Sequence, residues 1–160
     1  VILDGGNCEN GVESTIVGFE DNQAVLYRHG AISLEEIEAT IGKVIIKSKN
    51  DVDPTAPGML TRHYAPSTDM YLTTNVAEYI QLFAGKKIGL LLFKESIDNT
   101  FVTHQEILSK TGNMKEATKE LYAALHRLDQ LKLDVIIAEK FPDNNLGKTI
   151  NDRLQRGVEK

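Results

Sequence analysis

The segment Ile88-Gly89-Leu90-Leu91-Leu92-Phe93 decides the fold class, because it runs without a polar or charged side chain. A strand of this kind is typical of the centre of a parallel sheet, where helices cover both faces. Asp134–Ala138 contains a similar run, Val-Ile-Ile-Ala, and predicts a second buried strand. Shorter strands are expected at Met70–Leu72 and at Glu106–Ser109.

Helix signals alternate with these strands. An asparagine followed three residues later by a glutamate, a pairing that can cap a helix, occurs at Asn75–Glu78 and at Asn113–Glu116. Behind the second pair, apolar residues recur at helical spacing from Ala117 to Leu131, and Thr149–Gln155 predicts a closing helix. Repeated strand–helix units with right-handed crossovers predict an α/β fold, a Rossmann-like three-layer domain with a parallel sheet, over residues 69–160.

Residues 1–48 have a different pattern, rich in β-branched, aromatic and aliphatic residues. The stretches Ser14–Phe19 and Ala24–Arg28 are separated by a Glu-Asp-Asn sequence with turn-forming chemistry, and they predict a hairpin. A serine followed by a glutamate at the capping distance predicts a short helix from Ser33 to Gly42. A brief strand is expected at Val44–Ile46.

Between these two parts, residues 49–68 show little apolar periodicity and contain Pro54, Pro57 and Pro66. Proline removes a backbone donor and restricts the residue before it, so this segment predicts a linker rather than a helix or strand. A structureless loop of about 20 residues would be unusual inside one compact domain. We therefore expect a domain boundary here.

The composition is that of an ordinary globular protein, with 41% apolar and 26% charged residues among 160. Its apolar runs are far shorter than the roughly 20 residues of a membrane span, so no membrane association is expected. A net charge of −5 disfavours strong direct binding of nucleic acid, tRNA included. The single cysteine, Cys8, cannot form an intramolecular disulfide, which fits a reducing, cytoplasmic location.

Several other features have ordinary explanations. Gly147-Lys148-Thr149 follows a predicted strand, as a phosphate-binding loop would, but Pro142 stands where that loop requires a glycine. Each histidine lacks a second histidine or a cysteine at metal-ligand spacing, so no metal site is expected. We expect His104 in a loop, and His126 and the basic residues of the last helix on solvated faces.

Three segments contain the candidate site residues. Ser14 and Thr15 place neighbouring hydroxyls before a strand core, where they can contact a ligand, although such residues are also common at strand starts. Arg28 ends a strand, and its guanidinium suits bidentate capture of phosphate or carboxylate, with an exposed salt bridge as the alternative. In the linker, His63 and Tyr64 are costly in conformational entropy to order, which indicates that the linker packs onto something.

These motifs occur together in the order of one enzyme family. The set is similar to the C-terminal part of the two-domain L-threonylcarbamoyladenylate synthases, the long members of the YrdC-like family. Each motif alone is weak, but their order over nearly the whole chain makes the resemblance specific. The motifs are Asp4-Gly5-Gly6, Gly11-Val12-Glu13-Ser14-Thr15-Ile16-Val17, Arg28-His29-Gly30-Ala31-Ile32, Pro57-Gly58-Met59, His63-Tyr64-Ala65-Pro66, Leu121–Asp129 and Asp152-Arg153-Leu154.

The resemblance implies an organisation and an activity. Residues 1–48 would be a remnant of an α+β YrdC-like catalytic domain, and residues 69–160 the C-terminal Rossmann-like domain. The family joins L-threonine, bicarbonate and ATP, taken as its Mg²⁺ complex, into threonylcarbamoyl-AMP and pyrophosphate. This nucleotidyltransferase reaction serves threonylcarbamoyladenosine modification of tRNA, so downstream tRNA-modifying transferase proteins would be partners.

The resemblance also implies roles for residues of this chain. Ser14 would contact threonine with Thr15 beside it, and Arg28 would contact ATP. His63 and Tyr64 would form part of a lid, with Tyr64 nearer the nucleotide, that excludes water from the mixed anhydride. No catalytic residue and no metal ligand is assigned to this chain.

Departures from the family pattern qualify these expectations. His29 replaces a proline, which should loosen the turn after Arg28, and Gly18 stands where an acidic residue is frequent. The basic Lys-x-Arg signature of the family's N-terminal part has no counterpart here, and the chain begins Val-Ile-Leu-Asp, without methionine or a leader-like segment. We therefore expect a C-terminal fragment that is inactive by itself.

Two other functions stay open. Residues 69–160 could be a non-catalytic Rossmann-like module that binds a nucleotide or a partner protein, or a purely structural carrier of the lid. The hairpin of residues 1–48 would have exposed edges, and such edges pair readily with another chain, so a homodimer is a further alternative.

Overall fold

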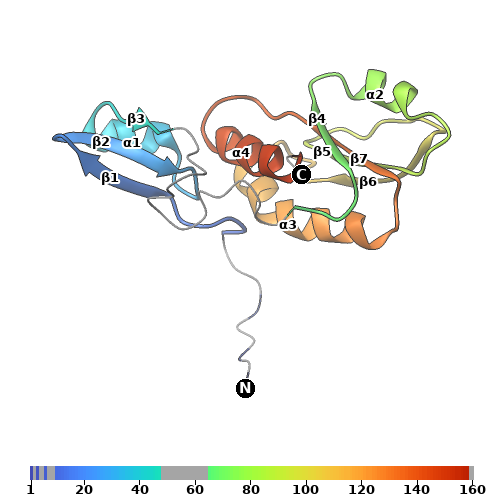
Figure 1. The fold of residues 1–160 in the computed structure, drawn as a ribbon, viewed down its shortest axis with the longest axis horizontal. Coiled ribbons are helices and arrows are strands. Elements are labelled where there is room, and N and C mark those ends of the chain that lie inside the picture. Colours follow the sequence, from blue (N-terminus) through green and yellow to red (C-terminus); the bar gives the residue numbers. More distant parts are fainter. Residues whose placement is uncertain (2, 4–5, 7–9, 48–64, 159–160) are drawn as a thin grey trace.

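The structure is a computed structural model that describes residues 1, 3, 6, 10–47 and 65–158. Figure 1 shows a small sheet with one helix beside a larger α/β part. Most of the predicted linker, residues 48–64, lies outside the described residues. The boundaries proposed for the linker therefore stay a prediction.

The small sheet has the predicted hairpin at its centre. Strands β1 (Ile16–Glu20) and β2 (Gln23–Arg28) pair antiparallel, and β3 (Ile45–Ile46) pairs with β2 in parallel. The two turn residues between β1 and β2 have positive φ angles of 46° and 63°, which asparagine and aspartate tolerate better than most residues. Helix α1 (Leu34–Ile41) covers one face over a core of Ala24, Leu26, Leu34 and Val44.

The larger part confirms the predicted parallel Rossmann-like architecture. Its sheet has the order β4-β7-β5-β6, and all neighbouring strands are parallel. The strands are β4 (Met70–Thr73), β5 (Ile88–Leu92), β6 (Val102–Ile107) and β7 (Val135–Glu139). Helix α2 (Val76–Leu82) lies on one face, and α3 (Met114–Gln130) and α4 (Leu146–Val158) lie on the other (Figure 1).

Alternation along the central strands builds a core on each face of this sheet. Leu90 and Ile137 belong to the cluster under α2, whereas Leu91 and Ile136 belong to the cluster under α3 and α4. All four side chains are completely buried. This double burial explains why β5 is an unbroken apolar run.

Local helix signals are confirmed at three N-termini. Ser33 and Glu36 form a reciprocal capping box at the start of α1. The Asn75 side chain accepts a hydrogen bond from the backbone of Glu78, and Asn113 caps α3 in the same way. These contacts need only neighbouring residues, so the sequence alone could predict them.

Two sequence-based expectations about the larger part are wrong. Strand β6 begins at Val102, earlier than expected, so His104 lies in a strand, where its ring contacts Glu106 at 3.1 Å. Strand β6 is an edge strand, and its side chains are mostly polar and partly exposed. A search for runs of apolar residues therefore does not detect its first residues. The last helix begins at Leu146, and its Arg153 and Arg156 are only 5% and 3% exposed, not solvated. Both arginines contact the Asp152 carboxylate of α4, and Arg153 also contacts Glu13 and the His29 carbonyl oxygen.

In the part of the chain that the structure describes, every helix is too short or too polar to cross a lipid bilayer.

Candidate functional site

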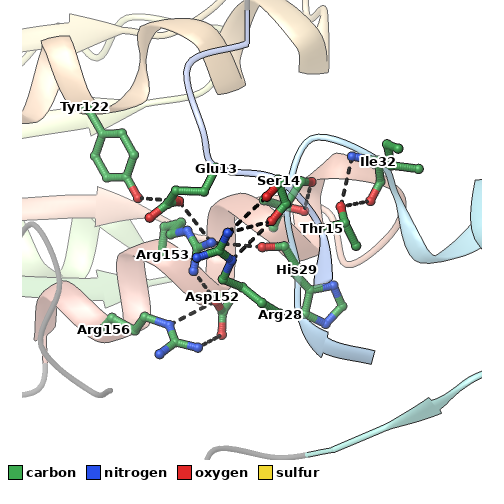
Figure 2. Close-up of polar contacts among 12 residues, drawn as sticks. Glu13, Ser14, Thr15, Arg28, His29, Ile32, Tyr122, Asp152, Arg153 and Arg156 are labelled. Atoms are coloured by element: carbon green, nitrogen blue, oxygen red, sulfur yellow. Dashed lines mark hydrogen bonds and ion pairs between the residues drawn. The ribbon is translucent and has the colours of Figure 1, made fainter. Parts of the chain in front are cut away.

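The predicted site residues Arg28 and Ser14 lie in direct contact where β2 ends and β1 begins (Figure 2). The Nε and Nη2 groups of Arg28 both donate to the Ser14 carbonyl oxygen, at 3.1 and 3.0 Å. Nη2 also donates to the Ser14 hydroxyl oxygen at 3.2 Å. The hairpin therefore brings together the guanidinium and the hydroxyl that sequence analysis selected separately.

The direction of these hydrogen bonds bears on ligand chemistry. The Ser14 hydroxyl oxygen accepts from the Arg28 guanidinium, so the hydroxyl proton is directed elsewhere. It can be donated to a carboxylate or carbamate. Ser14 is exposed and Arg28 is half-buried, so a ligand can reach both. The pair combines a fixed positive charge with a hydroxyl donor.

Thr15 has a different arrangement. Its hydroxyl donates to the Ile32 carbonyl oxygen at 2.6 Å and accepts from the Ile32 amide at 3.0 Å. These bonds tie the start of β1 to the loop before α1. The threonine contact suggested for Thr15 stays a prediction, and its hydroxyl is already engaged within the protein.

Gly30 allows the two chain segments of the site to pack closely. A Cβ atom at Gly30 would lie 2.3 Å from the Thr15 nitrogen and 2.4 Å from the Ser14 carbonyl carbon. The Ala31 amide donates to the Glu13 carbonyl oxygen at 3.0 Å, which holds the same two segments together. Any side chain at Gly30 would push Ser14 away from its present place.

Helix α4 holds this site from the other part of the chain, which sequence reasoning missed. Arg153 forms an ion pair with Glu13 at 3.0 Å and donates to the His29 carbonyl oxygen at 2.9 Å. The Thr149 hydroxyl donates to the Gly30 carbonyl oxygen at 3.0 Å. Asp152-Arg153-Leu154 was part of the family resemblance, but its pattern did not indicate which face of the helix was buried.

The turn after Arg28 is hydrogen-bonded to α4, and the expected loosening at His29 stays a prediction. The carbonyl oxygens of His29 and Gly30 are both hydrogen-bonded to α4. Burial lowers the pKa of the His29 imidazole, and the neighbouring Lys148 and Arg153 act in the same direction against the opposing effect of Asp152. The neutral form of His29 is therefore favoured beside this cationic helix.

The lid residues His63 and Tyr64 lie outside the described residues. Just beyond them, the Asp129 carboxylate of α3 accepts hydrogen bonds from the amides and hydroxyls of Ser67 and Thr68, at 2.8 to 3.1 Å. Burial alone would raise the pKa of Asp129, but these hydrogen bonds outweigh it and lower the pKa to about 2. The chain is thus fixed to α3 where it enters the larger part.

Among the described residues, no three histidine, cysteine, aspartate or glutamate side chains lie close enough together to hold a metal ion.

The fold and the site define a class: an α/β protein in which a parallel-sheet domain supports an arginine–serine pair on a smaller sheet. Residues 32–157 match the family model described as the C-terminal domain of threonylcarbamoyl-AMP synthase. This match covers most of the chain. The chain therefore belongs to the threonylcarbamoyl-AMP synthase family.

Curated relatives support this membership along nearly the whole chain. The threonylcarbamoyl-AMP synthase of Bacillus subtilis is 34% identical over 98% of this chain and 48% of its own length. That of Pyrococcus abyssi is 32% identical over 97% of this chain and 48% of its own length. The chain thus spans about half the length of the curated relatives that it matches.

Solved structures agree with the fold. The crystal structure of P. abyssi Sua5 complexed with L-threonine superimposes with a TM-score of 0.82 at 32% identity, over 97% of this chain and 48% of that one. A second P. abyssi Sua5 structure, of a variant in which a neighbouring histidine and tyrosine are both replaced by alanine, also gives a TM-score of 0.82, at 31% identity over 97% of this chain and 47% of that one.

Proposed function

We propose that this chain is the C-terminal portion of an enzyme that makes threonylcarbamoyl-AMP and pyrophosphate from L-threonine, bicarbonate and ATP. The observation that supports this most directly is the Arg28–Ser14 contact, because it provides a cation and a hydroxyl donor at one accessible point. Family membership supplies the reaction, and a relative of known structure binds L-threonine.

The chemistry requires what this pair offers. The threonine amine and bicarbonate form a carbamate and water, and a carbamate oxygen then attacks the α-phosphorus of ATP and displaces pyrophosphate. Negative charge gathers on the phosphoryl oxygens and on the leaving group, so fixed positive charge accelerates the step. Arg28 would contact the nucleotide, and Ser14 would donate its proton to the threonine moiety.

The remaining roles complete the proposal. The reaction is a nucleotidyl transfer, with ATP entering as its Mg²⁺ complex, in the cytoplasm. The product passes to downstream transferase proteins that modify tRNA. His63 and Tyr64 would close over the nucleotide. A neighbouring histidine and tyrosine were replaced together in a relative of known structure.

The test compares the full-length protein with this chain alone. We expect pyrophosphate release that depends on both threonine and ATP from the full-length protein, and none from residues 1–160. In the full-length protein, Arg28→Met should lower kcat/KM for ATP by about 100-fold, because a charge-assisted contact to phosphate is lost. Normal activity of Arg28→Met, or activity of the isolated chain, would contradict the proposal.

A nucleotide-binding module is the second candidate, and a hollow favours it. About 510 Å³ is open at the carboxyl ends of β4 and β5, where parallel sheets commonly bind ligands, and it is lined by Thr74, Asn75, Lys94 and Ser96 among others. Glu139 also lines this hollow and would repel phosphate. Calorimetry with ATP separates the two candidates: binding by this chain that survives Arg28→Met favours the module.

A further inference from the structure

Arg153 connects the larger domain to both segments of the candidate site at once. Its guanidinium pairs with the carboxylate of Glu13, the residue before Ser14, at 3.0 Å. The same guanidinium donates to the backbone oxygen of His29, the residue after Arg28, at 2.9 Å. Figure 2 shows these contacts beside the Arg28–Ser14 pair.

We propose that Arg153 is a positioning residue for threonylcarbamoyl-AMP synthesis, through which the C-terminal domain sets the separation and orientation of Ser14 and Arg28. This inference rests on the function proposed above and deepens it. It gives the C-terminal domain a role beyond carrying the linker.

The surroundings of Arg153 make its position rigid. Its side chain is buried, and the Asp152 carboxylate that contacts it at 3.0 Å also contacts Arg156 at 3.0 Å. The Tyr122 hydroxyl donates to the Glu13 carboxylate at 3.4 Å, so α3 helps to orient the partner of Arg153. Both terminal nitrogens of this buried guanidinium have acceptors, and its Nε is buried without a partner among the described residues. A displacement that broke the terminal contacts would leave a desolvated charge unpaired, so the group has little freedom to move.

Another contact between the two parts provides a matched control. Lys148, also on α4, pairs with Glu35 of α1 at 2.7 Å. This pair joins the same two parts of the chain, but its ion-pair partner belongs to α1, and within the described part of the chain Lys148 forms no hydrogen bond with the Ser14 or Arg28 segment. A general loss of attachment should therefore appear in Lys148→Met, whereas a loss of positioning should appear only in variants of Arg153.

The experiment uses the full-length protein with Arg153→Met, Arg153→Lys, Glu13→Gln and Lys148→Met. The first readout is hydrogen exchange at the Ala31 and Ile32 amides, which bond to the Glu13 carbonyl and the Thr15 hydroxyl. We expect protection to fall at least about tenfold in Arg153→Met and to stay unchanged in Lys148→Met. Glu13→Gln keeps an oxygen acceptor, so it gives a milder version of the test if Arg153→Met does not fold.

The second readout is steady-state kinetics. Arg153→Met should lower kcat/KM for threonine and for ATP by about 100-fold, since small misplacements of reacting groups have effects of this size. Arg153→Lys should recover part of this loss, because an ammonium keeps the charge but lacks the planar fork that serves two acceptors. Lys148→Met should stay within about twofold of the parent protein.

The outcomes separate this inference from the proposed function. Unchanged protection in folded Arg153→Met, or an equal loss in Lys148→Met, would overturn the positioning role. Lost protection with unchanged kcat/KM would also overturn it. If the parent protein releases no pyrophosphate, the proposed function fails, and the positioning role for that reaction fails with it, even though the exchange data still show whether Arg153 orders the two segments.

Discussion

The two sheets of this chain are stabilised in different ways. The larger sheet is covered on both faces by its own helices, and the side chains of its central strands are almost entirely inaccessible. The small sheet has one helix, and Phe19, Ile45 and Ile46 remain 73%, 43% and 51% exposed. The comparison teaches that the larger sheet buries both of its faces, whereas the small sheet leaves large apolar side chains exposed in this chain.

The connection between the two parts combines apolar and polar contacts, because Val12 belongs to the core cluster of the larger part and Ala31 packs against it. The Arg153–Glu13 and Lys148–Glu35 ion pairs and the Thr149–Gly30 hydrogen bond link α4 to the small part. Directional contacts of this kind fix geometry well but contribute little net stability. These polar contacts therefore orient the two parts more than they stabilise them, whereas burial of Val12 adds stability.

The largest effect on the free energy of unfolding is expected when a substitution creates a cavity in the larger domain. Leu91→Ala removes a completely buried side chain of β5, and such changes cost about 2–5 kcal/mol. Urea denaturation measures the loss. Leu131→Ala is the control, since this leucine is 46% exposed and its truncation should cost less than about 0.5 kcal/mol. Equal costs for both variants would mean that the larger domain is not tightly packed.

A smaller effect, confined to the other sheet, is expected from Gly30→Ala. The added methyl group would overlap the backbone of Ser14 and Thr15, which cannot move aside as a flexible side chain could. Overpacking of this kind costs about 1–3 kcal/mol. Calorimetry of the variant and the parent protein should show a lower transition temperature in the variant. An unchanged transition would contradict the close packing of Gly30 against the Ser14 and Thr15 backbone.

The same comparison explains how much the sequence could predict. Strands β5 and β7 were found because burial on both faces leaves an apolar run, and the helix starts were found because capping needs only nearby residues. The edge strand β6 was misplaced because its pattern is polar. The hairpin pairing that joins Arg28 to Ser14 follows from a local turn. The sequence alone could therefore predict this part of the site.

The contact of Arg153 with Glu13 could not be predicted from the sequence, for a physical reason. An arginine on an amphipathic helix has the same sequence pattern whether its face meets water or a buried carboxylate. Glu13 lies near the opposite end of the chain, and no local signal pairs the two residues. The burial of Arg153 and Arg156 depends on tertiary packing around α4, which the helical pattern does not specify.

A moderate, pH-dependent effect is expected at the entry to the larger domain. The folded-state pKa of Asp129 is about 2, below the ordinary 3.8, so its ionised form stabilises the fold. This contribution is complete above about pH 4 and is lost as the pH falls towards about 2. Asp129→Asn should cost roughly 1–2 kcal/mol at pH 7, discounted for partial solvent access, and should flatten the stability profile between pH 4 and pH 2.

The control for this prediction is Asp134→Asn. Asp134 lies at the same end of the sheet, just before β7, and accepts a backbone hydrogen bond from Lys87 at 2.7 Å. Urea denaturation at several pH values measures the free energy of unfolding. Between pH 4 and pH 2, Asp134→Asn should change it less than Asp129→Asn does. If both variants retain the parent profile between pH 4 and pH 2, the hydrogen bonds of Ser67 and Thr68 do not stabilise the folded state through the Asp129 carboxylate.

The smallest effect in this chain is expected at the exposed face of the small sheet. Phe19→Ser removes a ring that is 73% exposed, so the free energy of unfolding should change by less than about 0.5 kcal/mol. In the full-length protein we expect a larger loss, because the relatives are about twice as long and their additional residues can cover this face. Urea denaturation of both forms measures the difference. An equal, small effect in both would mean that Phe19 stays in water and that the small sheet is completed elsewhere.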